Sequence, residues 1–294
     1  MAMNTIDFPN YFADAEADFS NADFVIYGVG YQRCPSFRYG VDKASSEIRK
    51  ASWNFETYDL HTGVDISTIK IHDYGDVDVL KCTDSEMIER VKQFNVSLLK
   101  KQKFPIVMGG NHAITSAIIT SYPKDIAVLI LDAHMDYRQQ YEDSKYNHAC
   151  VLRRCVDHVG TENVAMLGVR SAEHDEFKQA TSDNIFFIDS FFIKKNGISK
   201  SIQQTQQYLK GKKIYLSIDS DVFDPSIAPA TGTPEPYGLT DFEVLEIIKA
   251  FSKDLVGFDI VEICPGFDYG QTCLLAAKII RQVIGLVSLN QKKS

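Results

Sequence analysis

The stretch Ala127-Val128-Leu129-Ile130-Leu131-Asp132-Ala133-His134-Met135-Asp136 passes directly from five apolar residues into two acids flanking a histidine. Its first half has the length of a strand and is apolar throughout, which is typical of a strand buried on both faces of a parallel sheet. If the strand continues, Asp132, His134 and Asp136 point to one side, because side chains alternate along a strand. The stretch therefore predicts a parallel strand with potential metal ligands at its carboxyl end.

Similar short apolar runs recur along the chain, each bounded by Gly, Pro or Asp. They are residues 24–27, 106–108, 164–167, 185–188, 214–218 and 256–260. Between them lie stretches with helical spacing, residues 85–101, 113–121, 197–209, 241–252 and 272–288. Thr240, followed by Asp241 and Glu243, has the pattern of a helix start. This alternation predicts one doubly wound α/β sheet, and a single domain over residues 1–294 in which residues 1–20 form an extension packed on its surface.

Composition narrows the class of protein. The formal net charge of the 294 residues is -8, which argues against a general nucleic-acid binder and suits a small cationic partner. The six cysteines form no C-x-x-C pair, a pattern typical of reduced cytosolic thiols. They are Cys34, Cys82, Cys150, Cys155, Cys264 and Cys273. No signal peptide is evident, and no apolar run approaches the ~20 residues of a membrane-spanning helix, so we expect a cytoplasmic protein without a membrane partner.

Two further apolar runs end like the first one. Residues 214–218 lead into Asp219-Ser220-Asp221, and residues 106–108 lead into Gly109-Gly110-Asn111-His112. Ligands bind beyond the carboxyl ends of parallel strands, so these side chains are expected to meet there. A single Asp at a strand end is more often a helix cap or turn former, and a single His is more often structural. Three strands that all end in Asp or His favour a metal site instead.

The chemistry of this residue set indicates the kind of metal. Carboxylates mixed with imidazoles suit divalent Mn, Fe, Co or Zn, and the excess of oxygen favours Mn. Four aspartates carry about the charge needed to neutralise two divalent ions. The sequence therefore predicts a binuclear site.

At this point the three segments resemble the signatures of the ureohydrolase family, which includes arginases, agmatinases, formiminoglutamases and guanidinobutyrases. They are residues 109–112, residues 132–136, and residues 217–225 continued by Ala228-Pro229-Ala230-Thr231-Gly232-Thr233-Pro234-Glu235. Residues 38–49 resemble the family's substrate-side loop and first helix. Within the family, residues 132–154 are most similar to archaeal and bacterial agmatinases.

The resemblance implies a three-layer α/β/α sandwich with a mainly parallel central sheet and two Mn²⁺ ions bridged by a hydroxide. It assigns His112, Asp132, Asp136 and Asp219 to one ion. It assigns Asp132, His134, Asp219 and Asp221 to the other ion, so that Asp132 and Asp219 bridge the pair. It also implies a homo-oligomer, a trimer or hexamer.

Two catalytic roles follow from the same resemblance: His148 matches the family's proton-shuttle histidine, and Glu262 matches the glutamate that binds the guanidinium. In the expected mechanism, Asp136 could steady the tetrahedral intermediate. A histidine such as His148, taken alone, is more often a surface-loop residue. Glu262 follows an apolar strand, where an unpaired carboxylate is costly to bury, so its expected partner is a cationic substrate or a protein arginine.

The implied reaction releases urea and an amine from a guanidino compound, with agmatine as the expected substrate. Glu173 is a candidate contact for the amine of agmatine, or simply an acid at a helix start. Guanidinobutyrate or formiminoglutamate would instead need a cationic contact from Arg138 or Arg153. An arginase usually has an Asn after the D-x-H-x-D cluster, where this chain has Tyr137.

Several positions depart from the usual family pattern. They are Asn111, Ala113, Ala149, Cys150 and Ala230. None of them is a proposed metal ligand, but a change beside His112 could alter its tautomer or basicity. Two other classes remain as alternatives, a zinc-dependent deacetylase with one metal and a non-catalytic relative with none.

Overall fold

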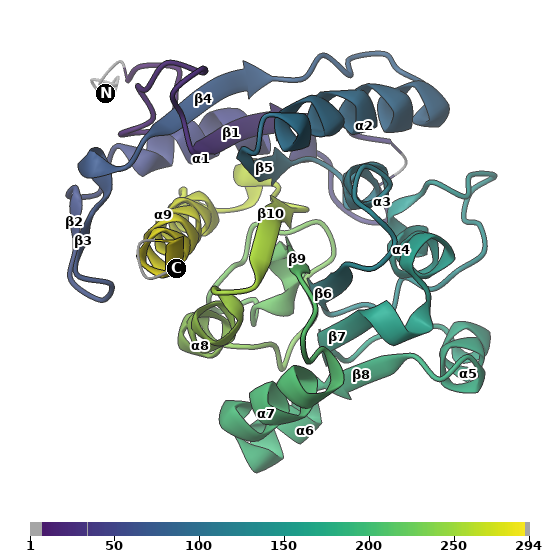
Figure 1. Ribbon diagram of the computed structural model, residues 1–294. Coiled ribbons are helices and arrows are strands. Elements are labelled where there is room, and N and C mark those ends of the chain that lie inside the picture. Colours follow the sequence, from purple (N-terminus) through teal and green to yellow (C-terminus); the bar gives the residue numbers. More distant parts are fainter. Residues whose placement is uncertain (1–7, 34, 292–294) are drawn as a thin grey trace.

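The computed structural model describes residues 8–33 and 35–291. The protein is built on an eight-stranded sheet in the order β4-β1-β5-β10-β9-β6-β7-β8, and every neighbouring pair of strands is parallel (Figure 1). The strands are β1 (Phe24–Val29), β4 (Ile71–Asp76), β5 (Phe104–Gly109), β6 (Ala127–Leu131), β7 (Val164–Val169), β8 (Phe186–Asp189), β9 (Ile214–Asp219) and β10 (Leu255–Val261). A separate antiparallel pair joins β2 (Tyr58–Asp59) to β3 (Val64–Asp65). The seven strands predicted from apolar runs are all present.

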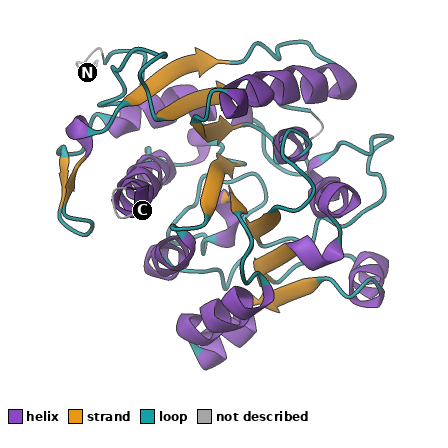
Figure 2. Cartoon of the chain, in the orientation of Figure 1, coloured by secondary structure: helices purple, strands orange, loops and turns teal. Residues whose placement is uncertain are grey.

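Helices cover both faces of the sheet (Figure 2). One face packs against α1 (Ala44–Ser52), α6 (Ser190–Asn196), α7 (Ile198–Tyr208), α8 (Asp241–Phe251) and α9 (Gln271–Gln291). The other face packs against α2 (Asp84–Lys100), α3 (Ala113–Ile119), α4 (Val151–Val159) and α5 (His174–Ser182). The predicted α/β/α sandwich with a mainly parallel central sheet is confirmed.

Alternation along the strands explains the continuous apolar runs. In β1, Phe24 and Ile26 enter one core whereas Val25 and Tyr27 enter the other, and all four are buried. Both sets of side chains leave water on folding, so both must be apolar. Truncating a fully buried residue such as Leu129 to Ala would cost ~2–5 kcal/mol of stability.

Strand β4 was not predicted because its sequence is unlike that of the central strands. Ile71-His72-Asp73-Tyr74-Gly75-Asp76 is mostly polar, and only Ile71 is buried. The strand lies at the edge of the sheet, where β1 is its one neighbouring strand and an isolated bridge joins His72 to Glu16 on the outer side. Polar residues are typical of such edges, where they discourage pairing with another chain.

The predicted helix start at Thr240 is confirmed as the N-cap of α8. Thr240 Oγ1 accepts a hydrogen bond from the Glu243 amide, and the Glu243 carboxylate accepts one from the Thr240 amide. This reciprocal pair is a capping box, which satisfies two amides that have no partner within the helix.

Helix α9 is, among the described residues, the one helix long and apolar enough to cross a membrane by length and composition. Within its 21 residues, an 18-residue window has a mean hydropathy of 1.6, and 78% of that window is buried inside the protein. Contacts with α1 and α8 account for its burial. It is therefore a core helix of the α/β sandwich.

The predicted N-terminal extension is described from residue 8 onward, and residues 1–7 lie outside the described part, as does Cys34. The Phe12 amide donates to Asp73 Oδ2 at 2.7 Å, and the Ala17 amide donates to the Ile71 carbonyl at 2.9 Å. Residues 8–20 thus run along the edge strand β4. The extent of the domain remains a prediction.

Candidate metal centre and substrate pocket

The four central strands, β5, β10, β9 and β6, carry the candidate site at their carboxyl ends. After β5 the chain turns sharply through Gly110, whose amide donates to the Val29 carbonyl at 3.1 Å. A Cβ atom at this position would lie 2.4 Å from the Tyr31 carbonyl oxygen, so only glycine fits. The turn places His112 directly before α3 and beside the ends of β6 and β9.

His112 lies at the centre of the first group of potential ligands. Its Nδ1 atom is 3.2 Å from Asp132 Oδ2, 3.1 Å from Asp219 Oδ2 and 3.8 Å from Asp136 Oδ2. All four residues are buried. Asp136 adopts a left-handed backbone with φ of 48°, an uncommon conformation that turns its carboxylate back toward the cluster.

A second group shares Asp132 with the first. His134 Nδ1 lies 2.8 Å from Asp221 Oδ2 and 3.8 Å from Asp132 Oδ1. Asp221 Oδ1 also accepts the Ala133 amide at 3.0 Å, which fixes the carboxylate against the end of β6. Five of the six predicted ligands thus form two adjoining groups that could each hold a metal ion, and the sixth, Asp219, lies beside His112 of the first group.

A series of hydrogen bonds that begins at His112 Nε2 orients its imidazole. Its Nε2 atom lies 3.1 Å from Ser217 Oγ, and Ser217 donates to Asp259 Oδ1 at 2.6 Å. Asp259 is completely buried, and its Oδ2 accepts from Tyr215 at 2.8 Å and from Thr115 at 2.9 Å. Because Ser217 donates to the carboxylate, its oxygen accepts from His112 Nε2–H, which leaves Nδ1 free for a metal.

Two observations show that this donor set fits divalent cations. His112 Nδ1 and Asp132 Oδ2 are both buried, and within the described chain neither has a hydrogen-bond partner. Burial, reinforced by the neighbouring carboxylates, raises the pKa values of Asp132, Asp136 and Asp219 above the ordinary aspartate value. Clustered acids buried in this way are costly unless a cation compensates them.

The pKa of His134 also indicates an excess of negative charge in the site. Burial opposes protonation of His134, but the carboxylates of Asp221 and Asp132 outweigh it and raise the pKa of His134 to about 11. A proton on His134 therefore takes the place that a divalent ion would fill. Metal ions require the neutral imidazole, so metal binding would release this proton.

Glu262 follows β10 and lies on the wall of the same site. Its Oε1 atom accepts the His112 amide at 2.6 Å, and its backbone has a left-handed φ of 61°. Burial raises the pKa of Glu262 to about 7, although the His112 amide acts in the opposite direction. Within the described chain Glu262 has no arginine or lysine partner, so the protein-arginine alternative is not supported.

His148 lines the same pocket as the acids, at the start of a 3-10 turn, His148–Cys150. Its Nε2 lies 2.8 Å from Ser36 Oγ, and its Nδ1 lies 3.2 Å from Asn111 Nδ2. Burial, followed by the positive charge of neighbouring side chains, lowers the pKa of His148 to about 4. The residue is therefore part of the pocket wall instead of a free surface histidine.

A cavity of about 210 Å³ connects these groups. Its lining includes His134, Asp136, Asp219, Asp221, His148, Glu262, Glu173, Arg138, Ser36, Tyr141 and Thr233. Arg153 is not part of the lining, because its guanidinium lies over the Tyr137 ring and beside Asp157.

Glu173 has both of the roles considered for it from the sequence. It lines the cavity and is also the N-cap of α5, where its carboxylate accepts the Glu176 amide at 3.2 Å. Arg138 stacks over the Tyr141 ring at 4.8 Å and lies 3.8 Å from Glu176 Oε2. The part of the cavity lining formed by Arg138, Glu173 and Glu176 therefore carries both signs of charge.

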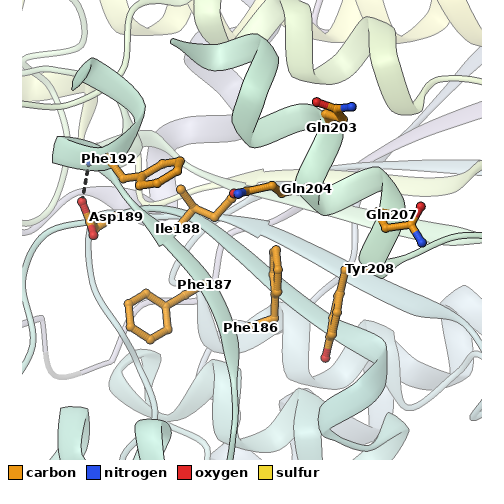
Figure 3. A pocket seen from close by; sticks show the side chains of 9 residues that line it. All are labelled: Phe186, Phe187, Ile188, Asp189, Phe192, Gln203, Gln204, Gln207 and Tyr208. Carbon is orange, nitrogen blue, oxygen red and sulfur yellow. Dashed lines mark hydrogen bonds between the residues drawn. The ribbon is translucent and has the colours of Figure 1, made fainter. Parts of the chain in front are cut away.

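A second cavity, of about 890 Å³, lies at the edge strand β8 and α7 and shares no lining residue with the first (Figure 3). Phe186 and Tyr208 stack there with ring centroids 4.3 Å apart. Its one carboxylate, Asp189, caps α6 by accepting the Phe192 amide at 2.6 Å. This cavity is larger but lacks the convergent polar groups expected of a catalytic site.

Some residues of the site escaped the sequence analysis. Ser36 and Tyr141 line the pocket from loops whose local sequence gives no sign of it, and Thr233 lies within the third signature segment but was not singled out there. Asp259 could have been noticed, because an acid inside the apolar run 256–260 requires buried partners.

Fold and site together define an α/β enzyme whose acid-and-histidine cluster could bind metal ions. Comparisons with known proteins agree. The model of the arginase family matches residues 22–285. The agmatinase of Bacillus subtilis (strain 168) is 30% identical over 281 residues, which cover 93% of this chain and 94% of the relative.

Two archaeal proteins are similar over comparable lengths. The N(1)-aminopropylagmatine ureohydrolase of Thermococcus kodakarensis is 33% identical over 271 residues, 91% of each chain. The crystal structure of the agmatine ureohydrolase of Thermoplasma volcanium superimposes with a TM-score of 0.93 at 37% identity, covering 98% of this chain and 97% of the other. The chain belongs to the arginase family and is a hydrolase, so the resemblance predicted from its three motifs is confirmed.

Proposed function

We propose that the protein is an agmatinase, which hydrolyses agmatine to urea and putrescine at a pair of Mn²⁺ ions. The observation that carries the proposal is that residues of both ligand groups line one cavity together with Glu262, whose carboxylate has no cationic partner among the described residues. The ligand groups would hold the ions, and Glu262 would hold a guanidinium cation. The similarity to agmatinases supports the choice of substrate.

The proposed ligands are those brought together at the strand ends. His112, Asp132, Asp136 and Asp219 would hold one ion, and Asp132, His134, Asp219 and Asp221 would hold the other. When bound, divalent ions supply Lewis acidity, which makes water a competent nucleophile at neutral pH.

Glu262 would bind and orient the guanidinium. One lone pair of Oε1 is used by the His112 amide, so Oε2 and the remaining lone pair of Oε1 can accept two parallel N–H groups. The rigid left-handed backbone at this residue fixes the plane of the carboxylate relative to the ligand cluster. A planar cation would thereby be held facing the Asp and His side chains.

His148 and Asp136 would manage protons on either side of the reacting carbon. His148 lines the cavity together with the ligand side chains, where a leaving amine nitrogen needs a proton to depart. Asp136 lines the pocket as well as the ligand cluster, so its carboxylate can hold a proton released from the attacking water. These two residues would carry no role in binding the far end of the substrate.

One observation on the cavity lining favours a second candidate substrate class. Arg138 is part of the lining, whereas the amine contact Glu173 already accepts a backbone amide. A guanidino acid such as guanidinobutyrate would place its carboxylate near Arg138. Agmatine would place its ammonium group near Glu173, which retains lone pairs for it.

The deciding experiment measures urea release by Mn²⁺-loaded protein with agmatine, N(1)-aminopropylagmatine, arginine and guanidinobutyrate side by side, and formamide release from formiminoglutamate. Urea from agmatine in preference to the others would support the proposal. Preference for a carboxylated substrate would contradict the choice of agmatine and support the second substrate class. Metal analysis of the same sample separates the remaining alternatives, since a deacetylase-like enzyme would hold one zinc ion and a non-catalytic relative none.

We further propose that the enzyme is cytoplasmic, contributes putrescine to polyamine synthesis and forms a trimer or hexamer. The scattered cysteines and the likeness to family members support these statements. Light scattering on the purified protein would give the oligomeric mass, and a monomer would contradict the last of them.

A further inference from the structure

Both nitrogens of the His148 imidazole are engaged by side chains that are not proposed metal ligands. Asn111 Nδ2 lies 3.2 Å from Nδ1, and Ser36 Oγ lies 2.8 Å from Nε2. Asn111 is buried directly before His112, whereas Ser36 lies on the exposed loop that follows β1. The imidazole is therefore held between a buried partner, Asn111, and an exposed partner, Ser36.

The orientation of the Asn111 amide is fixed by the backbone. Its Oδ1 atom accepts the Ala113 amide at 3.1 Å, at the start of α3. A reversed side chain would set the Nδ2 hydrogens against the Ala113 N–H, donor against donor. Nδ2 must therefore face His148.

This orientation decides which nitrogen of His148 carries the proton. An amide NH₂ group can only donate, so His148 Nδ1 accepts and carries no hydrogen. The neutral imidazole must then carry its proton on Nε2, where it donates to Ser36 Oγ. The hydroxyl hydrogen of Ser36 remains available to a substrate or water in the cavity that Ser36 lines.

We propose that Asn111 and Ser36 are positioning residues that hold His148 as a neutral imidazole with its proton on Nε2, and that Asn111 sets the pH at which His148 takes up a second proton. The proposal rests on the proposed function, in which His148 faces the leaving amine. A second proton would have to enter at Nδ1, where it would meet the Asn111 donor. Asn111 therefore opposes protonation until its amide turns away.

The other charged groups around His148 come from three segments. They are His112 before α3, His134 and Arg138 after β6, and Asp221 after β9, while the Tyr141 ring packs edge-on at 5.9 Å. Burial and the three basic residues disfavour the imidazolium and outweigh Asp221, which favours it. The surroundings thus act in the same direction as Asn111.

The test compares Asn111→Asp with Asn147→Asp in Mn²⁺-loaded protein. Asn147 is a matched control, because its Oδ1 accepts the Ala149 amide and it adjoins His148 without contacting Nδ1 in the described structure. Hydrogen–deuterium exchange at each imidazole Cε1–H, read by mass spectrometry, gives the protonation midpoint of each histidine. Asn111→Asp presents an acceptor to Nδ1–H and should raise the midpoint of His148 by ~1–3 pH units.

Equal shifts in the two variants, or none in Asn111→Asp, would overturn the proposal. Asn111→Ala is the second variant, because it removes the donor without adding charge beside His112, and it should raise the midpoint by a smaller amount. An unchanged midpoint in Asn111→Ala would also count against it. These readings do not depend on turnover, so they remain decisive even if no guanidino compound is hydrolysed and the proposed function fails.

Kinetics test the part assigned to Ser36. Ser36→Ala should lower kcat more than it changes KM, because the residue orients His148 without binding the guanidinium. Ser36→Thr retains the hydroxyl and should restore kcat. A Ser36→Ala enzyme with the kcat of the wild type would remove Ser36 from the proposal.

Discussion

Replacing Asp259 by Asn would test how the protein prepares His112 for a metal. The carboxylate accepts three hydroxyl groups, one at Oδ1 from Ser217 and two at Oδ2 from Tyr215 and Thr115. An asparagine keeps one acceptor oxygen, and this oxygen satisfies more donors at the Oδ2 position. Its NH₂ group then faces Ser217 and donates to it.

The consequence passes along the chain to the metal site. Ser217, now accepting from the introduced amide, turns its own hydrogen toward His112 Nε2, which lies 3.1 Å away. This favours the tautomer with the proton on Nδ1, the atom that faces Asp132 and Asp219. Loss of such an outer partner weakens metal binding by ~10–100-fold, or ~1.4–2.7 kcal/mol. We therefore expect a weaker Mn²⁺ affinity in a protein that is still folded.

Calorimetric titration of chelator-treated protein with Mn²⁺ would measure the effect. Asp254→Asn is the control, because Asp254 is partly exposed near Lys213 and Lys253 and directly precedes β10, at the end of the strand away from the ligands. An Asp259→Asn variant with the Mn²⁺ affinity of the control and of the wild type would refute the assignment of the Asp259–Ser217–His112 chain. Thermal unfolding of the metal-free variants separates this effect from a general loss of stability.

Four further outcomes follow from the structure. Glu262→Gln should keep its metal but lose kcat/KM by ~10²-fold or more, because a neutral amide misaligns the guanidinium; wild-type turnover would contradict this. Gly110→Ala should abolish Mn²⁺ binding, since its Cβ meets backbone 2.4 Å away, whereas Gly266→Ala, with nothing within 4 Å, should bind normally; equal binding would disprove the steric argument. Burial lowers the pKa of His148 from 6.5 to about 4 on folding, so the residue contributes up to ~3 kcal/mol to the free energy of unfolding above pH 6.5, and this contribution is lost as the pH falls through 4. Urea unfolding at pH 4.5 and 7 should therefore show a smaller loss of stability at the lower pH in His148→Gln than in the wild type, and an equal loss in both proteins would refute this. Arg138→Met should reduce turnover of guanidinobutyrate relative to agmatine, and an unchanged ratio would show that Arg138 makes no carboxylate contact.

The central strands and the ligand cluster were predictable because one physical constraint governs both. Buried parallel strands must be apolar on both faces, and their carboxyl ends meet at one edge, so polar residues following such strands lie together. His112, His134 and Asp221 come from three distant segments and nevertheless form the predicted groups. The constraint does not apply to the edge strand β4, which the sequence analysis therefore missed.

Contacts made by loops could not be predicted in the same way. Nothing in the residues around Ser36 indicates a bond to a histidine 112 positions later, because the path of an irregular loop depends on packing over the whole fold. Glu173 shows another limit. An acid at a helix start satisfies backbone amides whether or not it also meets a ligand, and the sequence pattern is the same in both cases.

The position of β10 has a consequence for how the protein is made. Among the described strands, residues 255–261 are the last in chain order, yet they lie between β5 and β9 at the middle of the sheet. Until they emerge from the ribosome, the nascent chain presents two open inner edges, the kind of surface that pairs with other unfinished chains. A chain arrested before residue 255 also lacks Glu262, so the candidate pocket is completed only after β10 has been made.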